Sequence, residues 1–206
     1  MTTYDNYIKL LRSDMSNWLI HFTKYDKNDI HNERYPFKNL NKIIEHKQLN
    51  GNNQLIRGDY KCICFSEAPL AKAISIIEYS DYIYNKTKER PFRYAPFGIA
   101  VKKEWLYNQS GRPVIYQSEQ EYSQTFEEQR YRHVRYEPNN GIDFTWEREW
   151  RIKCGQLSLQ PEHTTIIVKN KRYREQLLEK YYAEQSNNPF NIDIYPWGLV
   201  SLDELS

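Results

Sequence analysis

Two carboxylates, Glu147 and Glu149, stand two residues apart within an aromatic and basic segment at residues 143–151. In an extended chain, such side chains share one face and lie about 7 Å apart. That spacing suits an acid and a base better than a metal chelate. In a helix the segment would instead form an amphipathic turn in which Glu147 pairs with Arg151. The aromatic flanks and the following Gly155 favour a strand.

The opposite face of this predicted strand is mostly aromatic and should anchor it in the core. Its members are Phe144, Trp146, Arg148, Trp150 and Ile152. Clustered Glu and Arg side chains are often solvated salt-bridge partners, so a catalytic and a structural role both stay open.

His21 and Thr23 are further candidates because both fall on one face of an otherwise apolar predicted strand. They could share a ligand, although a histidine in a strand can also be a hydrogen-bonded core residue. Ser66 ends a second apolar run. Its hydroxyl could enter a cleft or could cap the helix that begins near Pro69.

A third candidate is the run at residues 130–136, where Arg130, Arg132 and Arg135 alternate with rings and a histidine. Such a run can hold phosphates while its rings stack on bases. A solvated edge strand would show the same alternation. The net charge of only +2 does not by itself indicate a nucleic-acid-binding protein.

Length and composition place these residues in one domain spanning residues 1–206. Aromatic residues make up 15% of the chain, including 18 Tyr, so the core must use amphipathic rings whose polar ends need partners. The three cysteines form no even disulfide framework and no metal-ligand pattern, which indicates reduced thiols. No signal peptide or membrane span is recognisable, and we expect a cytoplasmic protein without membrane contact.

The elements that must position the candidates alternate irregularly. We expect strands near residues 18–23, 62–66, 97–101, 113–116, 143–155, 165–168 and 190–195. Helices are predicted near residues 3–14, 40–50, 69–84, 102–107 and 172–183. This order predicts an α+β fold: a single domain with a mixed, mostly antiparallel sheet of six to seven short strands and flanking helices.

Four segments, in this order, resemble the bacterial abortive-infection AbiGi-like family: residues 62–70, 94–105, 111–116 and 147–151. The resemblance covers most of residues 18–170. It implies a context of phage resistance and an antitoxin role more than a particular chemistry.

A more remote resemblance is to the ADP-ribosyltransferases, including the DNA-modifying toxin DarT. It rests on His21 with Thr23, on Ser66 at a strand end, and on the E-x-E pattern of Glu147 and Glu149. The resemblance implies an ADP-ribosyltransferase-like fold that uses NAD. His21 would contact the NAD ribose, Ser66 would support the nicotinamide pocket, Glu149 would drive transfer and Glu147 would orient an acceptor. Thr23 and Tyr94 would also line the cofactor site. The residue after Ser66 departs from the usual serine motif.

This chemistry suits the residues, because a carboxylate can stabilise the positive charge that develops on the ribose when the nicotinamide bond breaks. Tyr79, Tyr82 and Tyr94 are candidates to stack on nicotinamide or adenine. The sequence thus predicts an ADP-ribosyltransferase-like protein of anti-phage defence or of a toxin–antitoxin system. Its partners would be a macromolecular target, nucleic acid or protein, and a cognate toxin or antitoxin. The alternatives are a non-catalytic antitoxin or binding module, and a metal-independent nuclease that uses His21 and the carboxylates.

Overall fold

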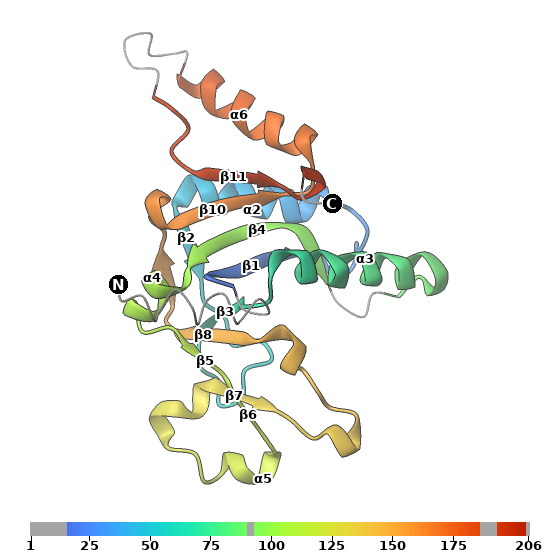
Figure 1. Ribbon diagram of the computed structural model, residues 1–206, viewed down its shortest axis with the longest axis vertical. Coiled ribbons are helices and arrows are strands. Elements are labelled where there is room, and N and C mark those ends of the chain that lie inside the picture. Colours follow the sequence, from blue (N-terminus) through green and yellow to red (C-terminus); the bar gives the residue numbers. More distant parts are fainter. Residues whose placement is uncertain (1–15, 90–92, 186–192, 205–206) are drawn as a thin grey trace, which may run out of the picture.

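A seven-stranded sheet forms the centre of the computed structural model, which describes residues 16–89, 93–185 and 193–204 (Figure 1). In spatial order its strands are β11 (Gly198–Ser201), β10 (Thr164–Val168), β4 (Tyr94–Lys102), β1 (Trp18–Lys24), β3 (Cys62–Ser66), β8 (Glu149–Lys153) and β5 (Arg112–Pro113). Neighbouring strands are antiparallel except β10 and β11, which are parallel. The predicted α+β domain with a mixed, mostly antiparallel sheet is therefore confirmed.

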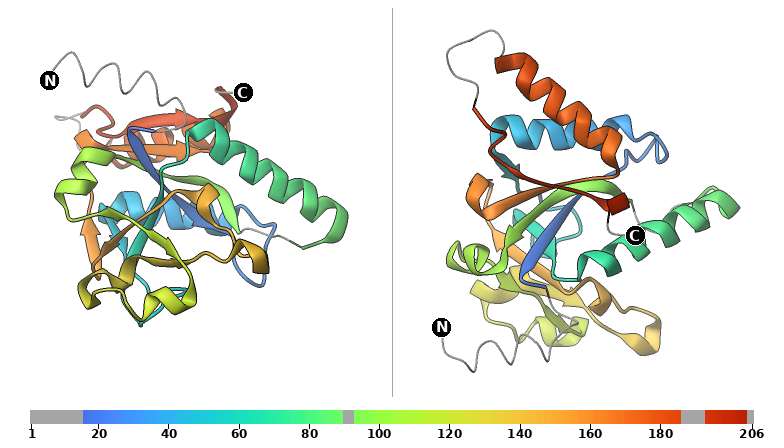
Figure 2. Two further views of the ribbon diagram at one scale, coloured as in Figure 1. Left: turned by 60° about the horizontal axis from the view of Figure 1, so that its bottom comes forward. Right: turned by 45° about the horizontal axis from the view of Figure 1, so that its top comes forward.

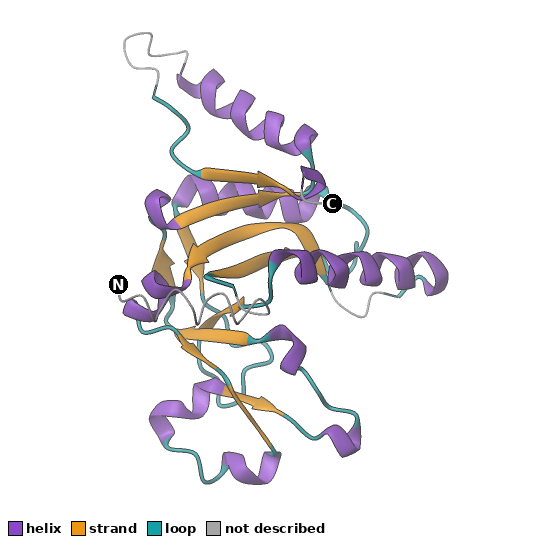
Figure 3. Cartoon of the chain, viewed as in Figure 1, coloured by secondary structure: helices purple, strands orange, loops and turns teal. Residues whose placement is uncertain are grey.

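The helices around this sheet are α2 (Arg34–His46), α3 (Leu70–Thr87), α4 (Lys103–Asn108), α5 (Glu119–Tyr122) and α6 (Lys171–Gln185), with short 3-10 helices η1 (Glu127–Arg132), η2 (Pro138–Asn140), η3 (Thr145–Glu147), η4 (Pro161–His163) and η5 (Leu202–Glu204). Helices α2, α4 and α6 contribute side chains to the core on one face of this sheet and α3 to the core on the other, while α5 lies away from it beside β6 and β7 (Figure 1 and Figure 3). In the described ranges, none of the helices has the length and apolar character that crossing a membrane requires.

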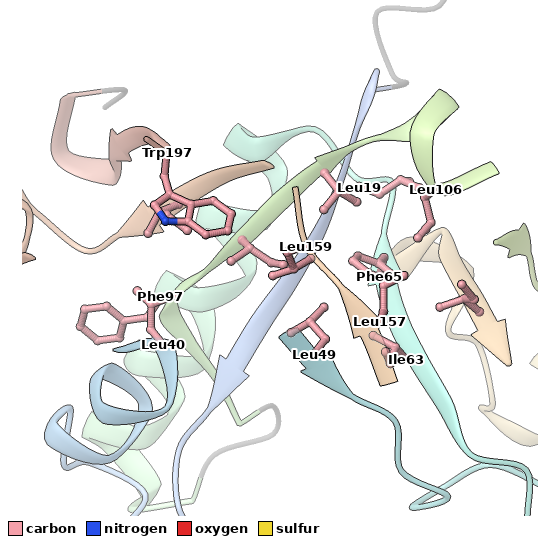
Figure 4. Close-up of a cluster of buried hydrophobic side chains, with 14 of the residues drawn as sticks. Leu19, Leu40, Leu49, Ile63, Phe65, Phe97, Leu106, Leu157, Leu159 and Trp197 are labelled. Atoms are coloured by element: carbon pink, nitrogen blue, oxygen red, sulfur yellow. The ribbon is translucent and has the colours of Figure 1, made fainter. Parts of the chain in front are cut away.

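Alternating side chains of the central strands belong to two hydrophobic clusters, one on each face of the seven-stranded sheet. The larger cluster joins Leu40 of α2 and Phe97 of β4 to the side chains of β3, β8 and β10 (Figure 4). The smaller cluster joins Ile20 of β1 to Ala73 and Ile77 of α3. These contacts hold only the first half of α3, whose second half extends beyond the sheet (Figure 2). The central strands are thus buried on both faces, which explains their near-continuous apolar runs.

Two small sheets flank the main one and were not predicted from the sequence. β2 (Gln48–Asn50) pairs with β9 (Gln156–Ser158), and β6 (Ile115–Gln117) pairs in parallel with β7 (His133–Arg135). The strand predicted at residues 113–116 is divided between β5 and β6. At the division, the backbone N–H of Val114 still donates to the carbonyl of Glu149 in the register of β5 with β8, and from Ile115 the chain pairs with β7 instead.

The predicted strand at residues 143–155 is wrong in its first part. The Asp143 carboxylate accepts hydrogen bonds from both the backbone N–H and the hydroxyl of Thr145, 2.8 and 2.6 Å long. Such local bonds compete with strand pairing, and the chain forms η3. Arg148 follows in the left-handed region, with φ of 45°, and β8 begins only at Glu149. The expected alternation therefore holds for β8 alone, and Trp146 is not part of the buried core.

The last predicted strand, at residues 190–195, is displaced along the chain. Residues 190–192 lie outside the described ranges, residues 193–197 form no strand, and β11 follows at Gly198–Ser201. Trp197, which is 6% exposed, anchors this segment in the larger cluster. The predicted helix at residues 3–14 also lies outside the described residues.

Candidate functional site

A cavity of about 610 Å³ opens where β1 and β3 diverge. Among the described residues, β1 and β3 pair with each other at one position, where Ile20 lies opposite Ser66. The cavity is lined by the consecutive residues 20–24 of β1 and 63–66 of β3. Because adjacent side chains of a strand point to opposite faces, such unbroken runs show that the cavity faces the edges of the strands. Its volume is typical of small-molecule sites.

His21 bridges the gap between the two strands. Its Nδ1 lies 2.8 Å from the backbone carbonyl oxygen of Cys64, and its ring packs edge-on against Phe65. A carbonyl only accepts, so Nδ1 carries the hydrogen and Nε2 of the neutral ring is an acceptor. Burial lowers the pKa of His21; the Cys64 carbonyl opposes this shift, and Lys24 adds to it. His21 therefore offers the cavity a hydrogen-bond acceptor at neutral pH.

Thr23 lines the same cavity, but its hydroxyl donates to the carbonyl of Phe97 in β4 at 2.9 Å. This bond lies where the register of β1 against β4 shifts, between Phe22 and Lys24. The hydroxyl thus satisfies a β4 carbonyl beside this irregularity. The Thr23 hydroxyl can still accept a hydrogen bond from a ligand, but its own proton is already donated to the Phe97 carbonyl.

Ser66 supports the loop that carries Glu147. Its Oγ donates to the carbonyl of Glu147 at 2.6 Å and accepts from the backbone N–H of Ala68 at 3.2 Å. The helix-capping role considered for Ser66 is wrong, because Pro69 is the N-cap of α3 and no side chain caps that end. The Ser66 hydroxyl lines the cavity as a positioning group.

Glu147 lies in η3 with its side chain only partly exposed, and it lines the cavity. Its Oε1 accepts a hydrogen bond from the hydroxyl of Tyr94 at 2.9 Å. Burial raises the pKa of Glu147, the charge of Glu149 raises it further, and the bond from Tyr94 opposes both. Burial also holds the pKa of Tyr94 well above its ordinary value, so this hydroxyl remains a donor. Glu147 is therefore a carboxyl group that can take up and release a proton.

Glu149 has a different environment at the start of β8. Both of its oxygens accept from Arg151, from Nε at 2.8 Å and from Nη2 at 3.0 Å. Only 11% of the Glu149 side chain and 6% of the Arg151 side chain are exposed. The remaining Arg151 nitrogen, Nη1, donates to the carbonyls of Tyr131 and His133, both at 2.9 Å. This network fixes the orientation of Glu149 and balances its charge.

The structure thus gathers His21, Thr23, Ser66, Tyr94, Glu147 and Glu149 around one cavity. The two carboxylates have distinct environments, one hydrogen-bonded by a neutral phenol and one ion-paired with a guanidinium. Pairs of titratable groups separated in this way commonly divide acid–base and electrostatic tasks between them.

Of the three arginines considered for nucleic-acid binding, only Arg135 lines the cavity. Arg130 Nε donates to the carbonyl of Thr125 at 3.1 Å, and Arg132 Nε donates to the carbonyl of Pro113 at 2.8 Å. These two side chains are tied to neighbouring loops, and the predicted set does not form one surface in the cavity.

Arg57, Cys64, His133 and Arg151 also line the cavity, although none of them was predicted as a catalytic or cofactor-binding residue. The spacing of Arg151 and Glu149 on one strand face was the one available signal. Burial raises the pKa of the Cys64 thiol well above its ordinary value, and the charge of Glu149 raises it further. Cys64 is therefore a protonated thiol at neutral pH.

The fold and the cavity define an α+β protein with a charged, ligand-sized site between two central strands of its sheet. Comparisons of the chain with protein-family models, with curated proteins and with solved structures gave no match. Among the described residues, no group of three or more His, Cys, Asp or Glu side chains is arranged to hold a metal ion.

Proposed function

We propose that this protein is an ADP-ribosyltransferase-like enzyme that uses NAD to modify a macromolecular target, nucleic acid or protein. We further propose that it acts in the bacterial cytoplasm, in anti-phage defence or in a toxin–antitoxin system. The observation that carries the proposal is the single cavity that brings together His21, Glu147 and Glu149 from segments far apart in the chain.

The cavity suits a polar ligand of nucleotide size. Its volume of about 610 Å³ falls in the range of sites for small molecules and cofactors. His21 Nε2 is an acceptor that a ribose hydroxyl can satisfy, and the ring of Tyr94 borders the same space. A partly apolar wall from Ile20, Phe65 and Ile77 would pack against rings of the ligand.

The two carboxylates suit two different tasks in such a transfer. NAD, when bound, supplies an ADP-ribosyl group: the ribose–nicotinamide bond breaks, nicotinamide leaves with the bonding electrons, and the acceptor bonds to the ribose. Glu149, held by Arg151, would face the developing positive charge without having to reorient. Glu147, with its raised pKa, would receive the proton that the acceptor loses.

The test measures nicotinamide release from NAD by the full chain, with single-stranded DNA, RNA and protein extracts as acceptors. We expect Glu149→Gln to lower release about a hundredfold or more, the usual effect of removing one preorganised electrostatic contact. Glu147→Gln should reduce transfer to the acceptor more than hydrolysis of NAD. Glu162→Gln, at an exposed carboxylate outside the cavity, is the matched control. A folded chain that neither binds NAD in calorimetry nor releases nicotinamide would refute the proposal.

A second candidate is a non-catalytic binding module or antitoxin, and one observation favours it. The carboxylate of Glu149 is ion-paired at both oxygens, and Ser66 is bonded to the backbone, as in a structural network. This candidate predicts a dedicated protein partner and no loss of biological effect in Glu149→Gln. NAD bound without any nicotinamide release would favour it over the enzyme.

A further inference from the structure

We propose that the end of the cavity formed by Arg57, His133 and Arg135 is a subsite for a phosphate group of the ligand. The inference rests on the proposed function for the nucleotide class of that ligand. The three residues come from the loop after β2 and from β7. In Figure 1, β7 lies beyond β8 from the central strands.

His133 supplies the first observation. Its side chain is 3% exposed and lines the cavity, yet within the described residues neither ring nitrogen has a hydrogen-bond partner. Buried polar atoms are nearly always satisfied, and leaving one unsatisfied costs about 1–3 kcal/mol. Tyr122 packs edge-on against the ring and holds it in place, with centroids 4.8 Å apart. The imidazole therefore has an N–H ready for an acceptor that a ligand would bring.

The charge around His133 is the second observation. Burial lowers its pKa, and the nearby guanidinium groups of Arg57 and Arg151 lower it further, which shows that both are close. Arg57 lies over the ring of Tyr122, 3.9 Å from its centroid, and its side chain is 42% exposed. Arg135 also lines the cavity; its side chain is 49% exposed, and its Nη2 donates to Glu137 Oε2 at 2.6 Å. Guanidinium groups beside an unused imidazole N–H can together donate to an anion that has several acceptor oxygens and replaces the carboxylates now paired with Arg57 and Arg135.

The carboxylate of Glu119 marks where such an anion would bind. It forms an ion pair with Arg57, and its Oε2 lies 3.8 Å from His133 Nε2, too far for a hydrogen bond. The Glu119 carboxylate thus lies beside both the Arg57 guanidinium and the His133 imidazole, but it makes no hydrogen bond to the imidazole. A phosphate has more oxygens and can contact Arg57 and His133 together, and it would displace Glu119.

Arg151 connects this subsite to the carboxylates. It binds Glu149 through two nitrogens and the carbonyl of His133 through the third. A ligand with its sugar near Glu149 and its phosphate near His133 would therefore lie along one side chain. The phosphate could belong to the diphosphate of NAD or to the backbone of an acceptor nucleic acid, and the chemistry of recognition is the same.

The experiment measures the affinity of the full chain for pyrophosphate, ADP and single-stranded oligodeoxynucleotide by calorimetry. His133→Phe keeps the ring shape and removes both nitrogens, and Arg57→Gln removes the charge at a half-exposed position. Each should weaken binding about tenfold to a hundredfold, as expected for a charge-assisted hydrogen bond. Arg172→Gln, at an exposed position of α6 outside the cavity, should leave the affinity unchanged.

Glu119→Gln provides a change of opposite sign. If Glu119 competes with the phosphate, its neutralisation should tighten binding several-fold, whereas a purely structural Glu119 would give no gain. Weakened binding of ADP and pyrophosphate alone assigns the phosphate to the dinucleotide, and weakened binding of the oligonucleotide alone assigns it to the acceptor. Unchanged affinity for all three probes in both Arg57→Gln and His133→Phe, or no binding by the wild type, overturns the subsite.

Nicotinamide release measured in parallel separates this inference from the proposed function. Binding of ADP that depends on His133 in a chain that never consumes NAD would keep the subsite and remove the enzyme. NAD consumption with an unchanged KM in Arg57→Gln and His133→Phe would keep the enzyme and remove the subsite.

Discussion

The turn at Thr145–Glu147 and the strand β8 at Glu149–Lys153 differ sharply, although they are neighbours in the chain. The turn is held by the hydrogen bond from the Thr145 N–H to Asp143 and by the Ser66 hydroxyl, and its carboxylate accepts a hydrogen bond from the phenol of Tyr94. The strand is held by pairing with β3 and β5, and its carboxylate is bound on both oxygens by Arg151. One short acidic motif therefore carries two carboxyl groups in different environments.

This difference shows how a motif can divide labour between its members. A carboxyl group that burial disfavours in its charged form holds its proton more tightly than an exposed one. A carboxylate that is bound by a guanidinium on both oxygens keeps its direction. The contrast can be tested without knowing any substrate, because each environment has its own effect on stability.

The largest expected loss of stability comes from breaking the Arg151–Glu149 ion pair in β8. Arg151→Met removes the partner of a buried carboxylate and leaves the carbonyls of Tyr131 and His133 without their donor. We expect the free energy of unfolding in urea to fall by about 3–5 kcal/mol, as when a buried pair loses one member. Lys102→Met, at the exposed end of β4, should stay within about 0.5 kcal/mol of the wild type. An Arg151→Met chain as stable as the control would show that the ion pair is not structural.

Glutamine substitutions compare the two carboxylates directly. Glu149→Gln leaves the Arg151 charge buried without a counter-ion and should lower the free energy of unfolding by about 1–3 kcal/mol. Glu147→Gln keeps an oxygen that accepts from Tyr94 and should remain within about 1 kcal/mol of the wild type. Urea unfolding at neutral pH measures both. Equal losses in the two variants would contradict the proposed division.

The backbone of the turn predicts a smaller effect. Arg148 has φ of 45°, a conformation that a β-branched residue resists and that glycine adopts freely. Arg148→Val should therefore be about 1–2 kcal/mol less stable than Arg148→Gly, and both variants lose the same side-chain contacts. The difference in thermal stability between the valine and glycine variants therefore measures the cost of the left-handed backbone conformation at residue 148. A valine variant that is the more stable one would mean that residues 145–148 continue β8 as a strand.

The pH dependence of stability gives the finest comparison. The pKa of Glu147 is higher in the folded chain than its ordinary value of 4.5, so the folded state binds this proton more tightly. The folded state then loses stability as the pH rises from 4.5 through the raised value, and the loss is complete above it. Glu147→Gln lacks this loss, and its stability relative to the wild type should rise across that window. A difference that does not change with pH in urea titrations would show that burial does not affect Glu147.

Much of the fold follows from patterns along the chain. Apolar runs at β1, β3, β4 and β10 form the expected strands, because a buried strand needs side chains that both faces of the sheet accept. The predicted helices at α3 and α6 also appear, with ends within a few residues of those expected. The short strand pairs β2–β9 and β6–β7 were not predicted, because a strand of three residues is too short to show a recognisable alternation of apolar and polar side chains.

The candidate site divides in the same way. The sequence by itself determined which side chains could do chemistry, since His21, Tyr94, Glu147 and Glu149 are visible as residue types, and His21 and Glu149 lie in strands that were predicted. Only the tertiary structure decided their partners. Tyr94 lies 53 residues from Glu147 along the chain, yet its hydroxyl donates a hydrogen bond to that carboxylate, and the nitrogens of His133 have no hydrogen-bond partner among the described residues. Local periodicity sets which face a side chain takes, but hydrogen bonding and burial depend on segments that only folding brings together.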